Sequence, residues 1–180
     1  MILIRNGRVL TMEHRAVYDP GYVLVDGERI LSVGPGDGPP DLVAGPDDRV
    51  VDAQGGTILP GFVEAHCHVG LWEDGSGWEG EDGNETSQPV TPHLRALDAI
   101  TPMDRCFREA LAGGVTTVMT GPGSANVLSG QFALLKNRPS SVDRMVMRAP
   151  AAMKAALGEN PKKAHGKARN VAPMTRMGNA

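Results

Sequence analysis

This sequence is poor in the residues that mark several classes of protein. Its two cysteines, Cys67 and Cys106, form no Cys-x-x-Cys pair, so neither a thiolate zinc site nor a redox pair is indicated. No apolar run approaches the roughly 20 residues of a membrane-spanning helix, and the N-terminus lacks the apolar segment of a signal peptide. Aromatic residues make up only 4% of the 180 residues, so aliphatic side chains and methionine must fill the core. We expect a cytoplasmic protein that does not contact a membrane.

The charge balance gives no sign of a nucleic-acid partner. The formal net charge is −3 and the sequence pI is about 5.9. A nucleic-acid-binding surface is instead expected to be basic and clustered. Residues 154–176 are rich in lysine and arginine, and we interpret them as a solvated segment rather than as a binding arm.

Residues 1–58 read as a series of short strands. The turn pairs Asn6-Gly7 and Asp26-Gly27 each lie between two extended apolar runs, which is the strongest local signal for a β-hairpin. Residues 34–48 are rich in glycine, proline and aspartate and are expected to form a loop. The pattern predicts a small, antiparallel, sandwich-like β unit as the first domain, residues 1–58.

The most informative stretch is a His-x-His pair at the end of an apolar run. Pro60-Gly61 marks the start of a strand, and His66 and His68 follow it at positions i and i+2. On a strand these side chains point to the same face, while Cys67 faces away. Two neutral imidazoles on one face are suitable ligands for zinc or a similar divalent ion. The bland alternative is two ordinary strand histidines.

Residues 50–68 resemble the start of the catalytic barrel in the metal-dependent amidohydrolase superfamily. Four further stretches are similar to an imidazolonepropionase-like branch of it: residues 90–94, 113–118, 121–127 and 158–162. The resemblance implies an α/β fold in which residues 59–180 form the first strands and helices of an incomplete TIM-type (β/α)8 barrel. A complete barrel needs roughly 250 residues, so we expect only the N-terminal part of one.

The rest of the chain predicts alternating elements. Residues 70–92 are expected to form a long loop that is mobile or forms a lid near the histidines, because the segment is long and polar and follows the ligands directly. Helices are predicted over 93–99 and 103–112, followed by a strand over 115–119. Residues 149–157 fit either a strand or a helix. Residues 162–180 show no core-forming pattern.

Further site residues follow from the resemblance. A glutamate binds metal in some deacetylase members, which makes Glu159 a third candidate ligand. Lys154 is a candidate for a carbamylated bridging lysine, although its position differs from the usual one on the fourth strand. Three more candidates, for substrate contacts, follow from position alone: His93 lies near the long loop, and Asn126 and Gln131 flank a Gly-rich loop. For His93 the alternative is a solvated histidine at the start of a helix. His14 and His165 are expected on the surface.

The function implied is hydrolysis of a C–N bond in a cyclic or linear amide by a metal-activated water, with zinc as the expected cofactor. No residue is assigned as the base that activates this water. An alternative of a different class therefore stays open: an inactive fragment, or one subunit of a split enzyme completed by a C-terminal partner chain. Self-association into a homo-oligomer is also expected, because a partial barrel leaves a strand edge exposed.

Overall fold

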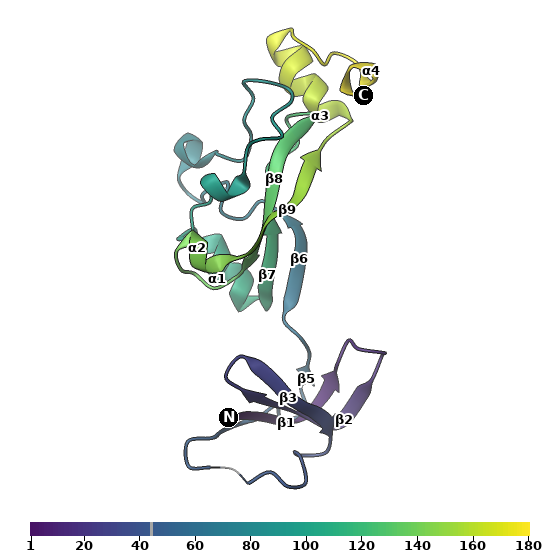
Figure 1. Ribbon diagram of the computed structural model, residues 1–180, viewed down its shortest axis with the longest axis vertical. Helices are drawn as coiled ribbons and strands as arrows, with labels where there is room; N and C mark the ends of the chain where they lie inside the picture. Colours follow the sequence, from purple (N-terminus) through teal and green to yellow (C-terminus); the bar gives the residue numbers. More distant parts are fainter. Residues whose placement is uncertain (44) are drawn as a thin grey trace. The chain divides into compact units, whose positions relative to one another are not determined.

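The computed structural model describes residues 1–43 and 45–180, which divide into two compact units, Met1–Pro60 and Gly61–Ala180. The regular structure of the first unit consists of strands, whereas the second unit combines strands with short helices (Figure 1). In the part of the chain that the structure describes, no helix is long and apolar enough to cross a membrane.

The first unit is a single mixed sheet rather than a sandwich. Its strands are β1 (Ile2–Leu10), β2 (Val17–Asp26), β3 (Arg29–Pro35), β4 (Arg49–Asp52) and β5 (Thr57–Ile58). The order is β3-β2-β1-β4, with β5 also pairing with β1. The β1–β2 and β2–β3 pairs are antiparallel as predicted, whereas β4 and β5 run parallel to β1.

One of the two predicted hairpins is present. Asp26-Gly27 joins β2 to β3, as the turn signal indicates. The prediction at Asn6-Gly7 is wrong, because β1 continues through both residues with a shift in its register to β2. Asn6 adopts a left-handed conformation (φ 56°), and its side-chain amide donates to Asp52 at 2.7 Å. The dipeptide therefore forms a bulge within β1 instead of a turn.

The second unit contains a four-stranded sheet in the order β6-β7-β8-β9. The strands are β6 (Phe62–Cys67), β7 (Val115–Thr120), β8 (Leu128–Lys136) and β9 (Val146–Ala155). Strand β9 settles the ambiguity over residues 149–157. Alanine and methionine favour helix locally, but pairing with β8 over most of its length prevails.

Helices cover one face of this sheet. Helix α1 (Arg105–Ala112) supplies Phe107 and helix α2 (Val142–Met145) supplies Met145, and both pack against Val118 of β7 and Leu135 of β8. In Figure 1 the two helices lie together beside the strands. The predicted helix over 103–112 is thus present, beginning after the N-cap Asp104, whereas the one over 93–99 is reduced to the 3-10 turn η2 (Ala96–Asp98).

The arrangement of strands differs from the all-parallel sheet of a barrel. Within the described second sheet, only the β6–β7 pair is parallel, and these strands are joined by the long connection that contains α1. Both later pairs are antiparallel. The short connection between β7 and β8 explains the change, because a parallel crossover needs roughly a dozen residues or more. Among the described residues the fold is therefore mixed α/β with two small sheets, and no barrel is formed.

The C-terminal segment also differs from expectation. It contains α3 (Glu159–Pro161), the π-helix η3 (Lys162–Lys167) and α4 (Arg176–Asn179), and Figure 1 shows it beside the ends of β8 and β9. His165 is fully buried, so its prediction as a surface residue is wrong, whereas His14 is exposed as predicted. The sequence shows no helical periodicity here because small and polar residues are buried in place of large apolar ones.

Candidate metal centre

His66 and His68 lie together at the end of β6. Their ring centroids are 5.5 Å apart and the rings are nearly perpendicular. Cys67 between them packs against the core and donates its thiol to the Met119 carbonyl, as the alternation along a strand requires. The histidines therefore occupy the face of the sheet that lies opposite α1 and α2.

His68 is held in one tautomer. Its Nδ1 lies 2.6 Å from the carbonyl oxygen of Gly121, and because a carbonyl can only accept, Nδ1 carries the hydrogen and donates it. The lone pair is then left on Nε2. A backbone carbonyl that fixes the far nitrogen of a histidine is the usual support for a metal ligand.

Lys154 of β9 completes this group. Its Nζ lies 3.2 Å from Nε2 of His66, and the residue is only 8% exposed. Burial lowers the pKa of Lys154, because the charged ammonium loses its hydration. In the part of the chain that the structure describes, no carboxylate forms a salt bridge with it. A buried amine with a lowered pKa is more readily neutral, and thus more nucleophilic, than a surface lysine.

Phe132 of β8 connects the histidines to β9. Its ring lies edge-on to His66, with centroids 5.5 Å apart, and it packs directly over Gly121. A Cβ at Gly121 would lie 2.2 Å from the Phe132 ring, so only glycine fits there. Gly121 therefore has two roles at this point, since its missing side chain admits Phe132 and its carbonyl orients His68.

The donor set fits a divalent metal but is small. Two imidazoles on one face suit zinc, and Nε2 of His66 would exchange its contact with Lys154 Nζ for the ion. Across residues 1–43 and 45–180, no group of three or more histidine, cysteine, aspartate or glutamate side chains is close enough to hold an ion. The cluster that does form consists of His66, His68 and Lys154.

Glu159, the third predicted ligand, lies at the start of α3. Its carboxylate is exposed and accepts from Lys162 Nζ at 2.7 Å, which lowers the pKa of Glu159. Neither this pairing nor any other described contact joins it to the histidines. Its role as a metal ligand stays a prediction, and it would require Glu159 to leave Lys162.

Asn126 is buried and its side chain is fully hydrogen-bonded. Its amide donates to the Glu85 carbonyl and to the Thr91 hydroxyl, and its oxygen accepts from His165 Nε2 at 2.7 Å. Asn126 thus links the loop before β8 to residues 85–91 and to the C-terminal segment. These contacts explain the residue structurally, and a substrate contact stays a prediction.

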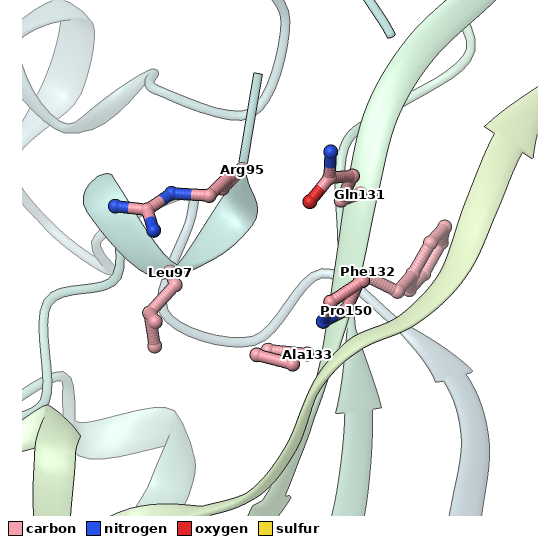
Figure 2. A pocket seen from close by; sticks show the side chains of 7 residues that line it. Arg95, Leu97, Gln131, Phe132, Ala133 and Pro150 are labelled. Atoms are coloured by element: carbon pink, nitrogen blue, oxygen red, sulfur yellow. The ribbon is translucent and has the colours of Figure 1, made fainter. Parts of the chain in front are cut away.

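Gln131 lies on the other face of β8 from Phe132, and hence from His66 (Figure 2). It lines a small cavity of about 130 Å³ with Arg95, Leu97 and Pro150, and its amide donates to the Pro92 carbonyl at 3.2 Å. His93, which follows Pro92 in the chain, is exposed. The structure therefore places neither Gln131 nor His93 beside the histidine pair, and their contacts with substrate stay predictions.

The connection over residues 70–92 contains little regular structure, but hydrogen bonds and an aromatic contact hold it against the rest of the unit. The backbone of Gly123 donates to Gly83 at 2.7 Å, and that of Ala125 donates to the side chain of Asn84 at 3.1 Å. Near its start, Trp72 packs against His68, with ring centroids 5.0 Å apart. The sequence contains one signal for this contact, because Trp72 is the first aromatic residue after the His-x-His pair.

No family model matches the chain. Amidohydrolase tasK of Hapsidospora irregularis is 36% identical over 146 residues, which cover 74% of this chain and 15% of that protein. Imidazolonepropionase of Myxococcus xanthus is 45% identical over 78 residues, covering 38% of this chain and 18% of its own length.

Among solved structures, an amidohydrolase from Thermotoga maritima MSB8 superimposes with a TM-score of 0.86 at 42% identity. The match covers 99% of this chain and 44% of that one. The chain therefore belongs to the amidohydrolase superfamily, whose members are metal-dependent, and imidazolonepropionases are among its relatives. It spans less than half the length of each of these three relatives.

Proposed function

We propose that this chain supplies the first metal-binding strand of a metal-dependent amidohydrolase that hydrolyses a C–N bond in a cyclic or linear amide. The observation that carries the proposal is the histidine pair at the end of β6, with Nδ1 of His68 held by the Gly121 carbonyl. When bound there, a divalent ion such as zinc would lower the pKa of a water molecule to about 7 and polarise the amide carbonyl.

The residues of this chain would divide the remaining tasks. His66 and His68 present their imidazoles on one face, and Gly121 keeps the Nε2 lone pair of His68 available. We propose Lys154 as a third ligand group after carbamylation, because its buried amine lies beside His66. In that step the neutral amine adds to the carbon of carbon dioxide and loses one proton, which leaves carbamate oxygens as ligands.

Metal binding provides the direct test. We expect the wild-type chain to retain zinc stoichiometrically after dialysis, and His66→Ala combined with His68→Ala to abolish this retention without changing the far-UV circular dichroism. Lys154→Ala should weaken binding, whereas Lys167→Ala, at an exposed site, should not. Equal zinc content in the wild type and in the double variant would exclude the proposed centre. Carbamylation predicts a mass increase of one carbon dioxide, lost on acidification.

A specific observation favours a second candidate, in which a complementing chain or a second copy completes the site. Strand β6 forms an edge of its sheet, and Phe62 and Val63 on it are exposed. An exposed apolar edge strand is a template for pairing with another strand. In this case the chain alone should show no turnover with a panel of cyclic and linear amides plus zinc. Turnover by a monomer in sedimentation would contradict it.

The proposed setting is a reducing cytoplasm. Both Cys67 and Cys106 are free thiols, and burial raises the pKa of the Cys67 thiol. The Cys67 thiol points to the Met119 carbonyl, away from the face that carries the imidazoles, so it does not compete with them as a metal ligand.

A further inference from the structure

Trp72 contacts the candidate ligand His68 from the connection that follows β6. The two rings are edge-on, with centroids 5.0 Å apart and planes at 70°. The second tryptophan, Trp78, lies on the same connection but is 81% exposed. Trp78 therefore serves as a control for Trp72, because it is in solvent whereas Trp72 lies against the site.

The position of Trp72 is fixed by its surroundings. It packs against the core cluster on one side and against Gly83 on the other. A Cβ at Gly83 would lie 2.1 Å from the indole ring, so this position has no room for any side chain. Backbone hydrogen bonds close the connection around it, from Asp82 to Leu71 at 3.0 Å and from Glu73 to Gly80 at 2.9 Å.

The contact matters because one hydrogen bond leaves an imidazole free to turn. The bond from Nδ1 to Gly121 selects the tautomer of His68, but a single bond does not prevent rotation of the ring about its Cα–Cβ and Cβ–Cγ bonds, and such rotation breaks that hydrogen bond. A packed aromatic neighbour removes this freedom. Ligand geometry must be held closely for a metal site to bind well.

We propose that Trp72 is a positioning residue that fixes the imidazole plane of His68, and that Gly83 is required to admit its indole ring. The proposal rests on the proposed function for the value of that orientation, but it makes a prediction about His68 in the absence of metal as well. Without the indole, the His68 imidazole should no longer stay in the single orientation that keeps Nε2 available.

The test compares Trp72→Ala, Trp72→Phe and Trp78→Phe by competition for zinc against a chromophoric chelator. Loss of a group that orients a metal ligand costs on the order of tenfold or more in affinity. We expect a loss of that size in Trp72→Ala, substantial rescue by Trp72→Phe, and wild-type affinity in Trp78→Phe. Zinc should change the tryptophan fluorescence of Trp78→Phe, which retains Trp72, but not that of Trp72→Phe.

A second variant guards against simple misfolding of Trp72→Ala. Gly83→Ala leaves both rings intact but displaces the indole, and should weaken zinc binding in the same direction. Gly113→Ala is its control, because a Cβ there meets no atom closer than 3.4 Å. Wild-type affinity in both Trp72→Ala and Gly83→Ala would overturn the proposal.

Nitrogen NMR of the metal-free chain separates this proposal from the proposed function. The wild type should show His68 in the Nδ1–H tautomer alone, and Trp72→Ala should show a mixture of tautomers. That result without zinc binding by the wild type would support the positioning role and refute the metal centre. Zinc binding by the wild type together with an unchanged tautomer in Trp72→Ala would refute the positioning role alone.

Discussion

The unit Met1–Pro60 buries few apolar side chains, chiefly Val9, Val23 and Leu24, whereas Gly61–Ala180 encloses a continuous core around Phe107. On the first sheet an apolar hollow of about 780 Å³ lies open, lined by residues that include Ile4, Val25, Ile30, Val33 and Ile58. A sheet with one unfilled apolar face gains less from burial than a sheet covered by helices. The two units should therefore respond differently to substitution.

The largest effect is expected at the core of the second unit. Phe107 is completely buried between α1 and the sheet. Phe107→Ala should destabilise this unit by about 3–5 kcal/mol, through lost burial and the cavity left behind. Chemical unfolding followed by Trp72 and Trp78 fluorescence, which reports only on this unit, should show the loss. A shift equally large in the hydrogen-exchange protection of β1–β3 would contradict the expectation that the two units respond differently.

A smaller effect should appear on acidification. Burial, and to a lesser extent the charge of Arg169, lower the pKa of His165, and its Nδ1 has no hydrogen-bond partner among the described residues. The unfolded chain then binds more protons than the native one as pH falls below about 6.5. Stability of the second unit should therefore decrease from that pH down to the lowered native pKa. Unfolding at several pH values measures this slope.

His165→Gln should flatten that slope, because glutamine retains a donor for the Asn126 oxygen but does not titrate. His14→Gln, at an exposed site, is the matched control and should leave the slope unchanged. A slope unaffected by His165→Gln would show that other groups cause the acid sensitivity.

A still smaller effect is expected at the start of α1. The Asp104 carboxylate accepts from the Cys106 backbone at 3.0 Å and so caps the helix. Asp104→Ala should cost about 1 kcal/mol, and Asp104→Asn should restore most of it because asparagine is an equally good cap. Thermal unfolding of the two variants provides the comparison, and equal losses in both would exclude capping as the cause.

The smallest change in stability is expected in the first unit, at Ile30. This side chain lines the hollow but is 65% exposed. Ile30→Thr should change the free energy of unfolding by no more than about 0.5 kcal/mol. It should nonetheless reduce the binding of a hydrophobic dye and any concentration-dependent association in sedimentation. Unchanged dye binding would show that the hollow does not provide the accessible apolar surface.

How much of the fold could be predicted from the sequence depended on whether a local segment or pairing between distant strands determines it. Local signals were reliable where one short segment determines the structure, as at Asp26-Gly27, in helix α1 and in the alternation around His66. They failed at Asn6-Gly7, where pairing with neighbouring strands overrides turn propensity. The direction of β8 and β9 could not be predicted either, because the resemblance implied successive parallel strands.

The candidate site was predictable only in part for a similar reason. The His-x-His pair is visible in the sequence because both ligands come from one strand. The approach of Lys154 to His66 is not predictable from spacing, because it depends on how the four strands β6 to β9 pair in the sheet. Trp72, Gly83 and Gly121 act through packing, and composition or spacing does not report on that.

The pairing of His66 with Lys154 has a consequence for the order of folding. The two residues are 88 positions apart in the chain, with β7 and β8 between their strands in the sheet. Closing so long a loop costs entropy, and nonlocal contacts of this kind slow folding. Because the connections from β7 to β8 and from β8 to β9 are short, these three strands can pair before β6 and its histidines join β7. The amine of Lys154 should therefore reach His66 among the last events, so that a complete cluster marks the end of folding in this unit.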